Sequence, residues 1–203
     1  MLVSHWRKGA PWLLAGLALF LMAAAPAQAH HLIDITGLKP TPINGLLSGL
    51  AHPVLGPDHL LFLLALALVG LRQRLRWMVG LLVVGMLGST AGLIGPGLLG
   101  ADVLVSLTLV VEALVLLGRL PGWLLLPAMA LHGYVLSAVV LDWSAMPLVA
   151  YLGGLLLSQG TLLVVSLALL QPAARQLQRH GRRLVAALLI GAGVVTALSQ
   201  ALA

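Results

Sequence analysis

The chain has 203 residues, of which 61% are hydrophobic and only 8% are charged, and its mean hydropathy is +1.09. A soluble domain is about half apolar and about a quarter charged, so this composition excludes an ordinary water-soluble globule and makes lipid the solvent for most of the surface. The net charge of +6 comes from short basic clusters between apolar runs, a pattern that argues against a nucleic-acid partner. Because cysteine is absent, disulfides and thiolate metal sites are excluded as well.

Residues 1–29 have the organisation of a cleavable signal peptide. A basic pair, a short apolar run and an A-x-A cleavage site that ends at Ala29 follow one another in that order. Cleavage would leave His30 as the mature N-terminus and residues 30–203 as a single transmembrane domain. The alternative is an uncleaved first helix, which would add a seventh span.

The remainder divides into six apolar runs that are separated by glycine, proline and charge. A helix needs about 20 apolar residues to cross a hydrocarbon core of about 30 Å, and open strands are not viable in lipid. The sequence therefore predicts an all-α, polytopic membrane protein with six transmembrane helices after the signal peptide. The predicted spans are residues 43–70, 77–97, 102–118, 122–141, 146–170 and 183–202.

The distribution of basic residues predicts the orientation of these spans. With the mature N-terminus outside, the outer segments carry one basic residue, Lys39. The inner loops then carry eight: Arg72, Arg74, Arg76, Arg119, Arg175, Arg179, Arg182 and Arg183. This asymmetry fits the positive-inside rule and agrees with export of the N-terminus by a signal peptide. We expect a multi-pass protein of the cell's inner (cytoplasmic) membrane with both mature termini outside.

Five ionisable side chains fall within the predicted spans: His52, Asp58, His59, Glu112 and His132. A charge at mid-bilayer costs at least ~2.5–3.5 kcal/mol on insertion scales, so such residues usually mark a site. From the helical rise, His59, Glu112 and His132 each lie about 15 Å from one predicted membrane surface. Three helices therefore carry an ionisable group to the same depth. Imidazole and carboxylate donors together suit a divalent first-row metal ion.

His52 and His59 belong to one dense motif, His-Pro-Val-Leu-Gly-Pro-Asp-His. In an unbroken helix the two imidazoles would share a face but lie about 10 Å apart along the axis, too far for one metal ion. The two prolines and the glycine between them predict a break in the helix. Asp58 could ligate the metal, hold a neighbouring imidazole or merely cap the helix that follows. His52 could instead be an interfacial histidine.

Simpler explanations stay open for several of the other residues. His132 could be a packed polar residue that is bonded to a helix backbone. Glu112 resists such an explanation because a carboxylate in lipid needs a partner or a proton; Thr108, one turn earlier, could supply a hydrogen bond. His30 and His31 could chelate a metal ion outside, together with the free α-amine, or could be a chance pair at a processing site.

The stretch from His52 to His59 resembles the signature of the HupE/UreJ family of nickel and cobalt permeases, His-Pro-x-x-Gly-x-Asp-His. The resemblance extends to a signal peptide, six spans, a glutamate on the third span and a His-Gly-Tyr sequence on the fourth. It implies metal-handling roles for His52, Asp58, His59, Glu112 and His132. The chain departs from the family pattern at Leu136, where a second histidine of the fourth span is usual.

The leading hypothesis is a permease, and not an enzyme, for a divalent metal ion, with nickel first and cobalt next. The ion would be the transported substrate, and no cofactor is expected. The sequence has no G-x-x-x-x-G-K-[ST] loop, so it cannot drive transport by its own ATP hydrolysis. The expected partners are the metal ion and the lipid bilayer, with no nucleic acid. Two alternatives stay open: an intramembrane zinc metalloenzyme and a metal-responsive accessory protein without transport.

Overall fold

The computed structural model describes residues 39–69, 74–95, 97–137, 140 and 143–202. Every regular element within these residues is helical, which confirms the all-α prediction. The predicted signal peptide and the pair His30 and His31 lie outside the described residues.

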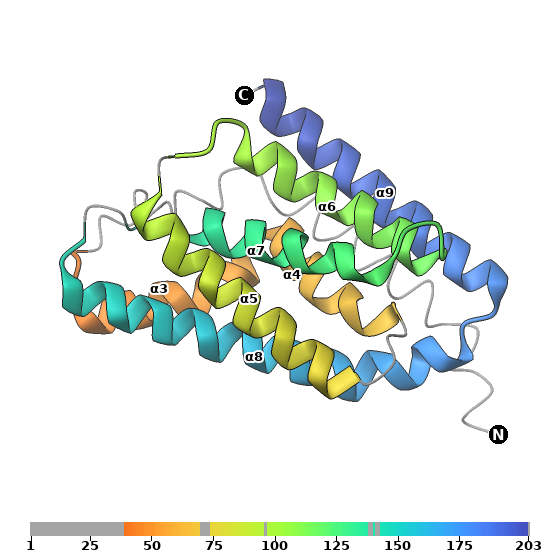
Figure 1. The fold of residues 1–203 in the computed structure, drawn as a ribbon, viewed down its shortest axis with the longest axis horizontal. Helices are drawn as coiled ribbons and strands as arrows, with labels where there is room; N and C mark the ends of the chain where they lie inside the picture. The colour runs from red at the N-terminus through yellow and green to blue at the C-terminus, as the bar shows by residue number, and fades with distance from the viewer. Residues whose placement is uncertain (1–38, 70–73, 96, 138–139, 141–142, 203) are drawn as a thin grey trace.

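The helices pack mainly as three pairs around a short central helix. In chain order they are α3 (Pro42–Leu55), α4 (Pro57–Ala65), η2 (Leu66–Leu68), α5 (Arg74–Ile94), α6 (Ala101–Leu116), η3 (Gly122–Leu124), α7 (Leu125–Leu136), α8 (Ala145–Gln176) and α9 (Arg179–Leu202). The pairs are α3 with α8, α5 with α7, and α6 with α9 (Figure 1). α4 contacts α3, α6, α8 and α9, and most of its side chains are buried. Residues at the start of α4 therefore face the interior of the protein.

The first apolar run forms two helices rather than one. α3 ends at Leu55, α4 begins at Pro57, and the axes on either side of the break differ by 72°. Gly56 lies between them with an extended backbone, φ −77° and ψ 109°, a conformation that the residue before a proline favours. Pro57 occupies the first turn of α4, where no backbone N–H is needed. The predicted break is confirmed, and it lies at Gly56 rather than at Pro53, which stays inside α3.

Helix length divides the elements into two groups. Among the described residues, three helices are long and apolar enough to cross a membrane, Leu75–Ile94, Ala145–Gln176 and Arg179–Leu202, and the bent α3–α4 pair would make a fourth. α6 has 16 residues, about 24 Å of helix, and the helical segment Gly122–Leu136 is also short. These lengths fit a membrane protein, while the count of six spans stays a prediction.

Glycine allows two of the helix pairs to come into backbone contact. A Cβ atom added at Gly88 or Gly133 would overlap the backbone of the facing helix in the α5–α7 pair. Gly49 and Gly154 play the same part between α3 and α8, as small residues do in membrane helix packing. The close α3–α8 contact matters for the site because it brings Tyr151 of α8 against α3.

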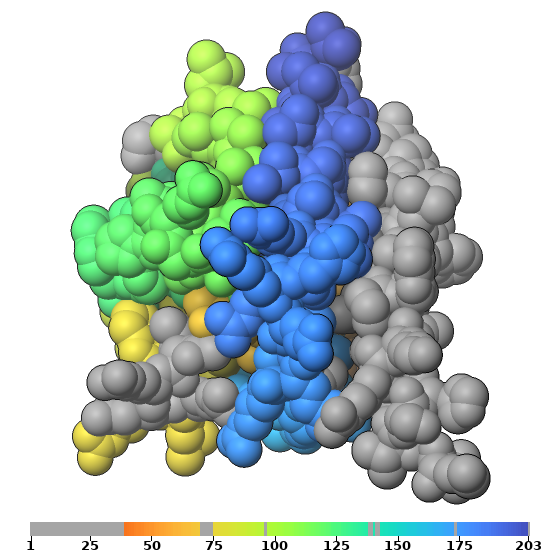
Figure 2. All heavy atoms as spheres, turned by 90° about the vertical axis from the view of Figure 1, so that its right-hand side faces the viewer, coloured from red at the N-terminus to blue at the C-terminus, as the bar shows by residue number. Residues whose placement is uncertain are grey.

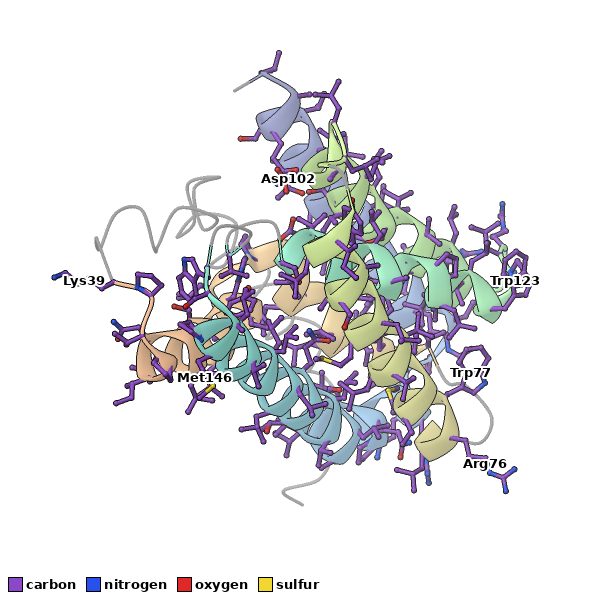
Figure 3. All side chains as sticks on the ribbon, turned by 60° about the vertical axis from the view of Figure 1, so that its left-hand side comes forward. Lys39, Arg76, Trp77, Asp102, Trp123 and Met146 are labelled. Carbon is purple, nitrogen blue, oxygen red and sulfur yellow. The ribbon has the colours of Figure 1, made fainter. Side chains whose placement is uncertain are left out.

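Charged side chains are separated between the two ends of the protein. Figure 3 shows Arg76 and Trp123 toward one end, and Lys39 and Asp102 away from it. Arg119 lies near the arginines at the start of α9, since they line one pocket. This separation agrees with the charge asymmetry that predicts the orientation, while the placement in a membrane stays a prediction.

Candidate metal site

The break after α3 brings the two histidines of the motif face to face. The rings of His52 and His59 are stacked, with centroids 6.0 Å apart and an angle of 8° between their planes. Both side chains are buried, so His52 lies inside the fold rather than on its surface. The bend gives the two imidazoles a common environment that a straight helix could not provide.

α7 contributes a third imidazole. The centroid of the His132 ring lies 4.9 Å from that of His59, and the rings meet edge to face at 69°. The ring of Phe62 also stacks on His132, with centroids 4.2 Å apart and an angle of 19° between the planes. The similar depths that the sequence predicts for His59 and His132 are thus matched by a direct contact. We call the rings of His52, His59 and His132 the imidazole cluster.

Asp58 connects the imidazole cluster to α6. Its Oδ1 accepts a hydrogen bond from the backbone N–H of His59 at 2.9 Å and lies 3.1 Å from Nδ1 of that residue. Its Oδ2 accepts from the hydroxyl of Ser106 at 3.2 Å, and that hydroxyl oxygen lies 2.9 Å from Oε1 of Gln200. Asp58 lies in the first turn of α4, where the helix dipole favours a carboxylate. Its contacts with the His59 ring and Ser106 show that Asp58 does more than cap the start of α4.

The hydroxyl of Tyr151 determines which nitrogen of His52 carries the proton. Nδ1 of His52 lies 2.7 Å from the Tyr151 oxygen, and the hydroxyl donates its one proton to the backbone carbonyl of Leu136. Because a carbonyl can only accept, the bond between His52 and Tyr151 requires Nδ1–H of His52 as the donor. The neutral ring therefore has its lone pair on Nε2, and a lone pair is what a metal ion binds.

Thr108 orients His132 in the same manner but selects the opposite nitrogen. The Thr108 hydroxyl donates to the carbonyl of Val105 at 2.6 Å, and its oxygen lies 2.7 Å from Nε2 of His132. Nε2–H of His132 is then the donor, and the lone pair falls on Nδ1. That Nδ1 is buried and has no hydrogen-bond partner among the described residues. It is therefore available to a ligand.

Glu112 is buried without a partner in the described part of the chain. Its side chain is fully excluded from solvent, and neither carboxylate oxygen accepts a hydrogen bond there. The hydrogen bond considered between Thr108 and Glu112 does not form, because the Thr108 hydroxyl donates to Val105 and accepts from His132. Glu112 follows Thr108 by one helical turn, about 6 Å. A buried carboxylate in this state needs a proton or a cation.

The described side chains do not form a ready-made metal cage. No group of three or more His, Asp or Glu residues among them is arranged to hold one ion. The imidazole cluster shows why: the ring centroids of His52 and His59 lie 6.0 Å apart in a stacked contact, and those of His59 and His132 lie 4.9 Å apart in an edge-to-face contact. A metal–nitrogen bond instead lies in the plane of the ring at about 2.0–2.1 Å. The rings would have to rotate before they could share an ion.

Two residues of the site, Tyr151 and Ser106, could not be identified from local sequence patterns. Their partners His52 and Asp58 lie 99 and 48 positions away. One signal was present, because Tyr151 is one of only two tyrosines and a buried phenol usually has a hydrogen-bond partner. That signal predicts a partner without saying which residue it is.

The comparison with known proteins identifies the family. A family model described as HupE / UreJ protein matches residues 17–196, which is most of the chain. The chain belongs to the HupE/UreJ family. No curated protein and no solved structure matches it. HupE/UreJ proteins are associated with nickel and cobalt transport and form a transporter and accessory family, so this membership supports a metal permease in general terms.

Proposed function

We propose that this HupE/UreJ protein is a permease that carries a divalent transition-metal ion, nickel first and cobalt next. The observation that carries the proposal is the imidazole cluster. Three rings from α3, α4 and α7 are in contact inside an apolar helical protein, with the carboxylate of Asp58 beside them. Imidazole and carboxylate donors suit these ions.

Two of the rings would bind the ion through the nitrogen that their hydroxyl partners leave unprotonated. Tyr151 leaves Nε2 of His52 with a lone pair, and Thr108 leaves Nδ1 of His132 with one. These hydroxyls would orient the ligands from outside the ligand set, as hydrogen-bond partners of metal-bound histidines do. The rings would rotate out of their stacked and edge-to-face contacts until their unprotonated nitrogens point at the ion. Such a transient site suits a permease, which must also release its ion.

Glu112 would supply the negative charge that the passing ion requires. Its buried carboxylate would hold a proton while the site is empty and would exchange it for the ion. Metal affinity should therefore fall as the pH is lowered. This exchange would couple metal transport to proton movement. The alternative is facilitated diffusion of the metal ion down the membrane potential.

The proposed orientation puts both mature termini outside the inner membrane and the arginine-bearing loops inside. His30 and His31 would then collect metal at the outer surface, together with the α-amine. N-terminal sequencing should find the mature chain beginning at His30, and a reporter fused after Arg74 should be internal. An intact Met1 terminus or an external reporter would contradict the orientation.

Uptake into proteoliposomes tests the proposed function directly. The wild type should take up nickel, then cobalt, in preference to zinc and manganese, and His59→Ala should abolish uptake while the protein stays in the membrane. Hydrolase assays on the same preparation would identify a zinc metalloenzyme instead. Metal binding without any uptake would identify an accessory protein.

A further inference from the structure

A pocket of about 450 Å³ opens at the arginine-bearing end of the protein. The described residues that line it are Leu116, Leu117, Arg119, Leu177, Arg179, Arg182 and Arg183. We call it the arginine pocket. It lies between the segment that follows α6 and the junction of α8 with α9. Figure 2 is viewed from this end, where the blue atoms of α8 and α9 meet green atoms from the middle of the chain.

The arginine pocket is separate from the proposed metal site. Leu116 lies ten residues beyond Ser106 on α6, about 15 Å along the axis, and Ser106 is the α6 residue that contacts Asp58. No carboxylate and no histidine is among the described residues that line the pocket. Four guanidinium groups would repel a divalent cation. The pocket therefore has the wrong chemistry to be the exit of the metal.

The positive-inside rule alone does not explain why arginines from different segments line one pocket. The positive-inside rule requires basic residues in the loops, and lysine satisfies it as well as arginine. Here Arg119 lies in the turn after α6 and Arg179 lies far away in the sequence, at the start of α9, yet both line the same pocket. Like charges that converge repel one another, and an anion between them offsets that repulsion more than solvent alone does. The convergence therefore indicates an anion.

The combination of guanidinium and leucine side chains indicates what kind of anion. The planar guanidinium group donates two parallel hydrogen bonds to phosphate oxygens, which the compact ammonium of lysine does not do. Leu116, Leu117 and Leu177 add apolar surface in the same pocket, where acyl chains could lie. Basic pockets between membrane helices bind phospholipid head groups in this manner. We propose that the arginine pocket binds a phosphate group, carried by an anionic phospholipid or by a soluble phosphate.

Binding to the purified full-length protein in neutral detergent tests this proposal. Native mass spectrometry would measure the retention of added phosphatidylglycerol and phosphatidylcholine, and calorimetry would measure the binding of inorganic phosphate. Wild type should retain phosphatidylglycerol in preference to phosphatidylcholine. Competition by inorganic phosphate would show that the phosphate group is what the pocket recognises, and binding of inorganic phosphate alone would assign the soluble source.

The variant Arg119→Gln/Arg182→Gln should bind the anion about tenfold more weakly. A matched control, Arg76→Gln/Arg175→Gln, removes the same charge from residues outside the pocket and should bind within about twofold of wild type. The variant Arg119→Lys/Arg182→Lys keeps the charge but loses the two parallel hydrogen bonds. Its affinity for the anion should therefore lie between that of Arg119→Gln/Arg182→Gln and that of the control.

Equal losses in the pocket variant and the control would assign binding to general charge attraction and overturn the proposal, as would a failure of both anions to bind wild type. Size-exclusion profiles identical to wild type would show that the variants are folded. None of these measurements depends on metal transport, so the phosphate site can fail while the proposed permease function stands.

Discussion

The imidazole cluster and the arginine pocket differ in where their polar side chains lie and in whether those side chains are permanently charged. In the imidazole cluster the polar groups are buried, and hydroxyls of Tyr151 and Thr108 direct the ring protons. In the arginine pocket the charged side chains are exposed, and their charge is permanent. The difference shows how the two proposed sites would work: the proposed cation site relies on imidazoles, which can stay neutral until the ion arrives. An anion site at the surface can carry its charge all the time.

The largest effect should come from removing a ring of the imidazole cluster. We expect His52→Ala and His59→Ala each to abolish metal uptake, a loss of about 100-fold or more, with the protein still in the membrane. The double variant should be no worse than either single variant, because the loss of one ligand already disables the site. His180→Ala, which changes an exposed histidine of α9, should transport normally. Normal uptake in His52→Ala would mean that this buried residue only packs between helices.

A smaller effect is expected at Glu112. Glu112→Gln keeps the size of the side chain but removes the charge, and it should lower uptake about thirtyfold. The decline of uptake at acidic pH should also become shallower, because one proton fewer competes with the metal. Asp102→Asn, in the first turn of the same helix, is the matched control. Unchanged transport and an unchanged pH profile would leave Glu112 as a packing residue.

Cross-linking asks whether Glu112 faces the imidazole cluster. In a chain without cysteine, the pair His59→Cys and Glu112→Cys should be joined by a short reagent. The pair His59→Cys and Asp102→Cys should not be joined, because Asp102 lies about 15 Å from Glu112 along α6. Equal yields for the two pairs would place Glu112 away from the cluster.

Removing a hydroxyl that orients a histidine of the imidazole cluster should have a more modest effect on uptake. Such a variant changes which ring nitrogen carries the proton without changing any charge. Tyr151→Phe keeps the ring but removes the acceptor for Nδ1–H of His52, and it should lower uptake about tenfold. ¹⁵N NMR of labelled histidine should show His52 protonated on Nδ1 in the wild type and in the control Tyr134→Phe. It should show a mixture of the two tautomers in Tyr151→Phe. The same tautomer in all three proteins would mean that Tyr151 only packs.

The smallest effect on metal uptake is expected at the arginine pocket. Arg119→Gln/Arg182→Gln should change uptake by less than about twofold, because no metal ligand is altered and the field change is screened by salt. A tenfold change in uptake would mean that the arginine pocket and the imidazole cluster belong to one transport path. The contrast drawn between the two regions would then be wrong.

The sequence predicts the parts of the site that follow from helix geometry. Prolines and a glycine at fixed spacing predict the break at Gly56, and the helical rise predicts that His59 and His132 reach the same depth. Both are confirmed. The structure also extends α8 to Gln176, beyond the predicted end of that span at residue 170. The helix passes through Pro172, so the end of the apolar run was not the end of the helix.

The remaining contacts depend on which helices are neighbours, and hydrophobic periodicity does not encode that. The sequence suggests Thr108 as a hydrogen-bond partner of Glu112, because the two residues share a face of α6. The structure gives Thr108 a different partner, His132 of α7. Tyr151 joins α8 to α3, and the glycine contacts between those helices allow that close approach. Single residues of common types, spread over several helices, carry no local signal for such contacts.

X-ray absorption spectroscopy of nickel-loaded protein tests the central claim most directly, because it reports the atoms bound to the transported ion. The account predicts two or three imidazole nitrogens with carboxylate or water oxygens in the wild type. The imidazole signal should be lost in His52→Ala/His59→Ala and kept in the control His30→Ala/His31→Ala. A nickel ion coordinated only by oxygen in the wild type, or an imidazole signal unchanged in His52→Ala/His59→Ala, would contradict the account.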